Sequence, residues 1–106
     1  KGLKKIDLVM NQMTGAISVD TESLVERLNI NFNQFTGSID FLPSLKNLAV
    51  ARLDNNMFDG TIPASLGKLV SLRVLTLHGN SFNGTMPDEI CELRRKHELE
   101  YLEADC

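Results

Sequence analysis

Apolar residues recur along the chain in a fixed frame, in which one apolar position is followed three residues later by a second and two residues after that by a third. The last two positions alternate with period two, which is the spacing of a strand that buries one face. The frame therefore predicts four short strands. Its members are Leu3, Ile6 and Leu8; Val25, Leu28 and Ile30; Leu48, Ala51 and Leu53; and Leu72, Leu75 and Leu77.

A second motif, Asn-x-Φ-x-Gly-x-Φ with Φ an apolar residue, follows each of these frames. Its asparagines are spaced by 22, 23 and 24 residues. They are Asn11, Asn33, Asn56 and Asn80. Four copies at nearly constant spacing indicate a solenoid, in which each unit contacts only its neighbours. One unit cannot fold alone, because its buried aliphatic side chains do not offset the conformational entropy lost in ordering about 23 residues.

The four asparagines stand where the chain leaves a predicted strand and turns inward. Buried main-chain groups at such a turn need partners, and a compact amide offers both donors and an acceptor. We therefore expect an internal hydrogen-bonded ladder of asparagines, with ligand binding by these amides as the alternative. Gly60 and Gly84 are expected to take positive φ after the apolar residue, and Pro63 and Pro87 to start the next segment.

Together these motifs resemble the leucine-rich-repeat family, in its plant-type extracellular subclass with the signature L-x-x-L-x-L-x-x-N-x-F-x-G-x-I-P. The segment 56–63 matches that signature almost position for position, and the resemblance recurs over nearly the whole chain. Departures are Ala51 in place of a large aliphatic residue, and Ser18 and Asp40 where proline would follow. The resemblance implies an α/β solenoid: a right-handed arc with a parallel sheet on its concave face and short 3-10 or helical segments on its convex face.

The chain of 106 residues, 42% apolar and 24% charged, has the size and composition of one globular domain. We expect a single domain over residues 1–106. Its repeat units are predicted at about 3–24, 25–47, 48–71 and 72–98, with a closing unit at about 88–106. Because the first residues already belong to a repeat, we also expect the chain to be a fragment of a longer protein.

After the fourth repeat motif the spacing changes. Residues 88–96 predict a helix with Asp88 as its N-cap and basic residues toward its end, and Leu99, Leu102 and Ala104 offer a fifth strand frame. This segment resembles the cysteine-bearing closing repeat of plant and algal extracellular leucine-rich-repeat proteins. The matching residues are Cys91 and Cys106. They could form a disulfide in an oxidising compartment, the alternative being two thiols in a reducing one.

Net charge argues against a nucleic-acid partner, since the chain carries −3 at neutral pH and its basic residues are scattered. Because no apolar run approaches the roughly eighteen residues of a membrane span, we expect no membrane insertion by this segment. The one glycosylation sequon, Asn83-Gly84-Thr85, adds weight to a location outside the cell or at its surface, with an intracellular location as the alternative.

Catalytic and metal-binding patterns are missing from the sequence. No Ser-His-Asp or Cys-His set stands at a diagnostic local spacing, and His78 and His97 lack the spacing of a zinc site. The pair Gly67-Lys68 is not a phosphate loop, because Leu69 replaces the required serine or threonine. We therefore expect no enzyme activity, no metal and no cofactor.

Outward-facing residues of the strands are expected to form columns across the repeats, and these columns are where recognition could occur. We hypothesise that a protein or peptide ligand docks across the concave face. The predicted contacts are Lys5, Asp7, Arg27, Asn29, Arg52, Asp54, Thr76, His78 and Tyr101. The alternative is a solvated surface with weakly paired opposite charges, such as Asp54 and His78. Met10 and Phe32 are expected to pack at the rim of this face.

The resemblance implies three settings for such a chain: receptor-like kinase or receptor-like protein ectodomains, secreted inhibitors of microbial wall-degrading enzymes, and matrix or adhesion proteins. All use the array for recognition. The leading hypothesis is a non-catalytic protein- or ligand-binding module of a secreted or cell-surface protein. The alternatives are a structural or scaffold subunit of a larger assembly and the regulatory module of a kinase.

Overall fold

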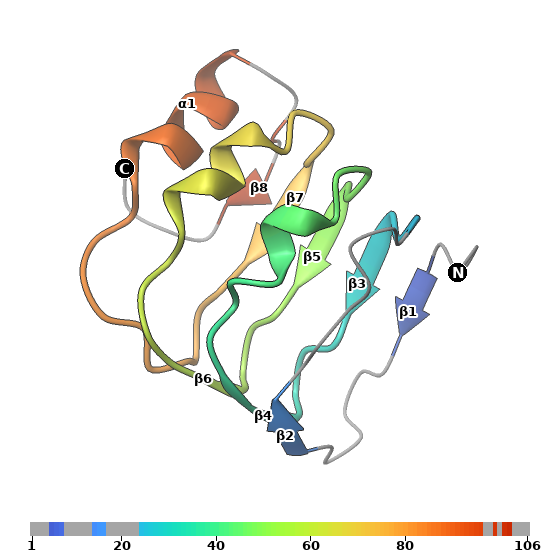
Figure 1. The fold of residues 1–106 in the computed structure, drawn as a ribbon, viewed down its shortest axis with the longest axis vertical. Coiled ribbons are helices and arrows are strands. Elements are labelled where there is room, and N and C mark those ends of the chain that lie inside the picture. Colours follow the sequence, from blue (N-terminus) through green and yellow to red (C-terminus); the bar gives the residue numbers. More distant parts are fainter. Residues whose placement is uncertain (1–4, 8–13, 17–23, 97–98, 100, 103–106) are drawn as a thin grey trace.

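A parallel sheet of five short strands runs along one side of the molecule (Figure 1). The computed structural model describes residues 5–7, 14–16, 24–96, 99 and 101–102. The strands, in their order across the sheet, are β1 (Lys5–Asp7), β3 (Arg27–Asn29), β5 (Val50–Arg52), β7 (Val74–Thr76) and β8 (Tyr101–Leu102). Neighbouring strands come from successive repeats, as expected of a solenoid of stacked units.

The register of the sheet pairs the same frame position of each repeat. Leu28 pairs with Ile6 on one side and with Ala51 on the other, and Ala51 pairs in turn with Leu75. Wherever side-chain burial is described, the frame residues are buried, from Val25 at 2% exposed to Leu77 at 5%. Ala51, the departure from the family pattern, is fully buried as well, so the smaller side chain still belongs to the core.

A second, three-stranded parallel sheet follows the first and was not predicted from the sequence. It consists of β2 (Thr14–Ala16), β4 (Gln34–Gly37) and β6 (Met57–Phe58), and an isolated bridge between Thr61 and Asn83 continues the pairing. Within it the rings of Phe35 and Phe58 stack with centroids 6.3 Å apart. Gly60 and Gly84 both have a φ of +78°, so the chain leaves this sheet in a conformation that disfavours other residues.

The side opposite the five-stranded sheet carries the helical segments (Figure 1). They are the 3-10 helices η1 (Leu42–Ser44) and η2 (Ala64–Lys68) and the α-helix α1 (Asp88–Lys96). The prediction of a helix over 88–96 is confirmed, but Asp88 is not its cap. The carbonyl of Pro87 accepts hydrogen bonds from the amides of Ile90 and Cys91, so Pro87 stands at the cap position.

Close packing joins η2 to α1. A methyl group built on Gly67 would lie 2.6 Å from Cβ of Glu89 and 2.9 Å from its carbonyl oxygen, closer than atoms of this kind can approach. Glycine at position 67 therefore lets α1 lie directly against η2. Between the helices and the sheet lies one apolar cluster, to which the helices contribute Leu42, Leu66, Ile90 and Leu93.

Asparagine side chains link each repeat to the one before it. The Oδ1 atom of Asn56 accepts the amide of Phe35 at 3.1 Å, and its Nδ2 group donates to the carbonyl of Ile30 at 3.0 Å and to that of Leu53 at 3.2 Å. Asn80 repeats this arrangement one unit later, with bonds to the amide of Phe58 and the carbonyl of Leu53.

The first described asparagine of the series, Asn33, donates to the carbonyls of Ile30 and Asn31. Both Asn33 and Asn56 are 7% exposed, and Asn80 is half-buried. The predicted fourth member, Asn11, lies outside the described residues. The side chains of Asn56 and Asn80 thus connect the backbones of three successive repeats by hydrogen bonds.

We expect Asn56→Ala to lower the free energy of unfolding by about 3 kcal/mol, because it leaves the buried Phe35 amide without a partner and removes one of the two side-chain donors to the Ile30 carbonyl. The matched variant Asn80→Ala removes the same pattern of bonds at a half-buried site, where water can replace part of them, so its loss should be smaller. Denaturant unfolding of both variants measures the two losses. Equal losses, or a neutral Asn56→Ala, would contradict a structural role for the buried amide.

Candidate functional site

Outward residues of the five-stranded sheet form columns, as the strand pairing shows. One column consists of Lys5, Arg27, Val50, Val74 and Tyr101, and the next of Asp7, Asn29, Arg52 and Thr76. For Asp7 and Tyr101 the structure describes the strand position and not the side chain. The register therefore brings together on one face most of the side chains that the sequence analysis selected for binding.

Exposure divides the first column into a polar end and an apolar middle. Lys5 and Arg27 are exposed, whereas Val50 is 9% exposed and Val74 is half-buried. Two basic side chains thus project from neighbouring strands next to a patch of aliphatic surface. Such a surface can hold a charged group of a partner at one end and an apolar group beside it.

A hydrogen-bonded cluster centred on Asp54 lies at the end of the second column. Its carboxylate accepts the hydroxyl of Thr76 at 2.5 Å and the side-chain amide of Asn55 at 2.9 Å. Nε2 of His78 lies 3.7 Å from the same carboxylate. The pairing of Asp54 with His78 that the sequence suggested is therefore present in the geometry.

Burial separates the members of this cluster into two roles. Asp54 is 5% exposed and Thr76 is 4% exposed, so neither offers much surface to a partner. The side chain of His78 is 49% exposed above them. Asp54 and Thr76 therefore serve to hold His78 in place, and among these three residues His78 is the one that a ligand could reach.

Two amides on this face carry an oxygen that accepts no hydrogen bond from the described residues. They are Oδ1 of Asn29 and Oδ1 of Asn31, and both are shielded from solvent. A shielded acceptor without a partner is unfavourable, and a donor supplied by a ligand after rotation of the amide would offset that cost. Asn31 was not in the predicted binding set, although it shares the column of Asp54 and His78.

Phe32, at the end of β3, is held in a conformation that aromatic residues rarely adopt. Its φ is +58°, and 48% of its surface is exposed, so the rim packing predicted for it is incomplete. The corresponding residues of the next two repeats, Asn55 and Gly79, share the positive φ and are of types that tolerate it. Aligning the repeats places Met10 and Phe32 at this position in the first two repeats, where the later repeats carry Asn55 and Gly79.

Comparison with known proteins identifies the repeat. A family model described as Leucine Rich Repeat matches residues 44–69 and 71–93. The chain belongs to the leucine-rich-repeat family. Among curated protein sequences, none matches the chain. Several solved structures do, among them a plant peptide hormone receptor and the ectodomain of a plant receptor kinase.

The plant peptide hormone receptor RGFR1 in complex with RGF2 matches 96% of this leucine-rich-repeat chain with 31% identity and a TM-score of 0.84. The ectodomain of the receptor kinase SOBIR1 from Arabidopsis thaliana matches 93% with 30% identity and a TM-score of 0.81. The BIR3–SERK2 complex from the same plant matches 87% with 31% identity and a TM-score of 0.76. The chain spans 16%, 53% and 51% of those three chains, respectively.

Two further predicted sites of this leucine-rich-repeat chain, Asn83 and Cys91, lie outside the five-stranded sheet. Asn83 is exposed, and its backbone amide donates to the carbonyl of Gly60 at 2.7 Å. Cys91 is half-buried on α1. Cys106 lies outside the described residues, so the pairing of Cys91 with Cys106 stays a prediction.

Within the described ranges, no group of three or more histidine, cysteine, aspartate or glutamate side chains could hold a metal ion. Among the helices of the described part of the chain, none combines the length and the apolar character that crossing a bilayer requires.

Because Phe32 is held at positive φ, we expect Phe32→Asn to raise the free energy of unfolding by about 1 kcal/mol, asparagine being far more tolerant of that region. Phe32→Leu serves as the control, since it removes the ring and keeps a side chain that disfavours the same φ. Thermal unfolding compares both variants with the original chain. A Phe32→Asn variant that is no more stable than the original would show that the backbone is not strained there.

Proposed function

We propose that this chain is a non-catalytic binding module of a secreted or cell-surface protein, and that it recognises a protein or peptide through the face of its five-stranded sheet. The observation that carries the proposal is the set of exposed polar side chains that successive strands place on that face. They are Lys5, Arg27 and His78, with the half-buried Arg52 between them. The repeat frame does not need these residue types, since its own positions are aliphatic.

The charges on this face favour an acidic group in the partner. Lys5 and Arg27 are paired in the sheet, and Arg52 occupies the second column two strands from Lys5. The acidic residue described on the same face, Asp54, is buried and already accepts two hydrogen bonds. A carboxylate of a partner would therefore meet basic side chains, and an arginine can bind it through two parallel hydrogen bonds.

Apolar contact would come from the aliphatic middle of the first column and from Phe32 at the end of β3. Aromatic residues that are exposed before binding and buried afterwards often supply much of the affinity of an interface. Structures similar to this chain include a peptide hormone receptor with RGF2 bound and a complex of BIR3 with SERK2. Those examples support a peptide or a protein as the partner class for this chain.

A peptide-display selection tests the proposal. Peptides are selected on the immobilised chain and then measured against the triple variant Arg27→Ala, Arg52→Ala, His78→Ala. We expect the selected peptides to be acidic and to lose about tenfold or more in affinity, because charged and hydrogen-bonded contacts are removed together. Circular dichroism of the triple variant verifies that it is folded.

The matched control is the triple variant Asp40→Ala, Asp59→Ala, Ser71→Ala, which changes three exposed residues outside the five-stranded sheet. It should bind the selected peptides as the original chain does. Peptides that bind the sheet variant undiminished, or that respond equally to both variants, would refute recognition by the sheet.

A location outside the cell leads to a second expectation, on the cysteines. Native chain should present no titratable thiol, and reduced and unfolded chain should present two, if Cys91 and Cys106 pair. Closing the loop between them is worth roughly 3 kcal/mol, so reduction should also lower the melting temperature by several degrees. Two thiols titrating in the native chain would contradict both the pairing and an oxidising compartment.

We also propose the exposed Asn83 as a glycan acceptor.

A further inference from the structure

An open groove of about 540 Å³ lies between η1 and η2, on the side of the molecule opposite the five-stranded sheet. It is lined by Pro43, Ser44, Lys46, Ser65, Lys68 and Leu69. None of these residues belongs to the surface proposed above for peptide recognition, so the groove is a separate feature of the fold.

The fold requires the leucines beside this groove but not its polar residues. Leu42, Leu45, Leu66 and Leu69 turn inward and are at most 2% exposed. The residues between them consequently face outward. Lys46 and Lys68 are not at corresponding positions of their repeats, since Leu45 corresponds to Leu69. Both lysines line this groove, and the repeat frame does not fix the residue type at either position.

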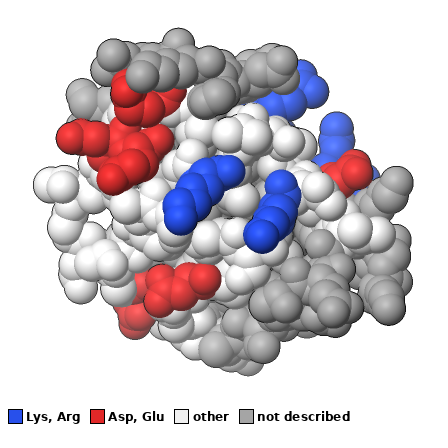
Figure 2. Space-filling model, turned by 45° about the horizontal axis from the view of Figure 1, so that its top comes forward, with Lys and Arg blue, Asp and Glu red and all other residues white. Residues whose placement is uncertain are grey.

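Both lysines are exposed, and no ion pair of either is present in the described part of the chain. Figure 2 shows basic side chains in the middle of a largely uncharged area, with acidic side chains on more than one side of it. The hydroxyls of Ser44 and Ser65 add hydrogen-bond donors to the same groove. A carboxylate entering the groove could therefore pair with either lysine, and no existing ion pair with a described residue would have to break first.

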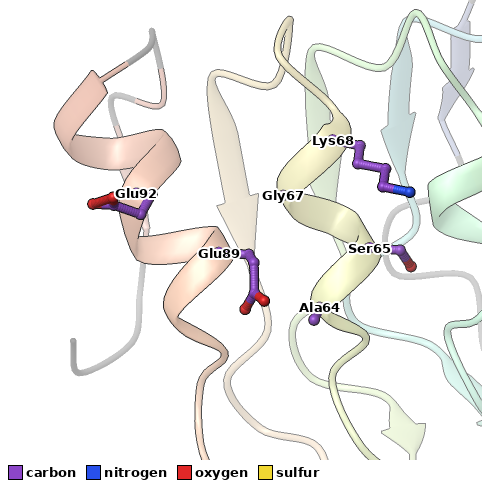
Figure 3. Close-up of a pocket in the computed structure, with 6 residues that line it drawn as sticks. All are labelled: Ala64, Ser65, Gly67, Lys68, Glu89 and Glu92. Carbon is purple, nitrogen blue, oxygen red and sulfur yellow. The ribbon is translucent and has the colours of Figure 1, made fainter.

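A second groove, of about 470 Å³, lies on the other side of η2 and has the opposite charge on its far wall. It is lined by Ala64, Ser65, Gly67, Lys68, Glu89 and Glu92. Figure 3 shows the carboxylate of Glu89 between α1 and η2, whereas Ser65 and Lys68 point away from α1. The helix η2 thus separates the groove lined by Lys46 and Lys68 from one that has the carboxylate of Glu89 on its other wall.

We propose that these two grooves together bind an extended segment of a partner protein that carries one acidic and one basic side chain about three residues apart. Neighbouring packed helical elements lie roughly 10 Å apart, and an extended chain advances about 3.3 Å per residue. An acidic side chain in the groove of Lys46 and Lys68 then leaves a basic side chain, three residues away, beside Glu89.

The carboxylate of Glu89 in the second groove also argues against binding of a uniformly anionic polymer, such as a polyuronate or a nucleic acid. A ligand long enough to fill the basic groove would place its next negative charge near Glu89, where like charges repel. The net charge of −3 opposes such a polymer as well. A segment of mixed charge matches both walls.

An NMR titration of the ¹⁵N-labelled chain tests the inference with the probe acetyl-Gly-Glu-Pro-Pro-Lys-Gly-amide. The two prolines hold the probe extended, at about 3.1 Å per residue, and so fix the separation of its charges. Comparison probes replace the Lys of the probe by Gln, its Glu by Gln, or its Lys by Glu.

We expect saturable shifts at the amides of Ser44, Lys46, Ser65, Lys68 and Glu89, with the mixed-charge probe binding about threefold or more tightly than any comparison probe. Lys46→Gln and Lys68→Gln should each weaken binding by roughly two- to fivefold, and raised salt should weaken it further. Lys46→Arg and Lys68→Arg are the matched controls and should restore affinity, because they keep the charge.

Three results would overturn the inference. They are the absence of saturable shifts on η1 and η2, tighter binding of the probe with two Glu residues, and affinities that do not change in the Gln variants. Because the probe is followed at amides of the helical side, failure here leaves recognition by the sheet untouched, and failure of the sheet variants leaves this inference untouched.

Discussion

Amide side chains that bridge successive repeats fix the geometry on which the rest of this molecule depends. Asn56 accepts from Phe35 in the preceding repeat, donates to Ile30 in that repeat and donates to Leu53 in its own. Because these bonds have definite lengths and directions, one repeat cannot slide past the next without leaving buried polar groups unpaired. The five strands are held in one register, and residues from distant parts of the sequence form straight columns.

The fixed register separates two sets of positions in each repeat. Aliphatic frame positions, such as Leu28 and Leu75, face inward and make every unit alike. Positions between them face solvent and differ from unit to unit, which gives the sheet face its basic end and the helical side its two grooves of opposite charge. Phe32 lies between these sets, since it occupies a turn position where later repeats carry Asn55 and Gly79. The fold requires neither a phenylalanine at this positive φ nor an exposed ring at this position.

Features set by local spacing could be predicted from the sequence, and features set by contacts between repeats could not. The strands followed from period two, and the columns followed from aligning the asparagines. The burial of Asp54 could not be foreseen, because it depends on the hydroxyl of Thr76, which is 22 residues away in sequence. The second sheet was missed because its strands fall within the asparagine motifs, where the sequence analysis expected a turn. The helix over 88–96 was recognised, but its cap differs by one residue because Pro87 supplies the carbonyl.

The contact at Gly67 means that the units of this array are not interchangeable. Matching Leu42 with Leu66 and Leu45 with Leu69 places Pro43 at the position of Gly67 in the preceding unit. A proline ring there would occupy the space into which Glu89 of α1 fits. The unit that contains Pro43 therefore could not stand next to α1, although it has the same aliphatic frame. Lengthening or shortening the array at this junction, by recombination or by design, requires that the last unit before α1 keep a residue without a side chain at that one point.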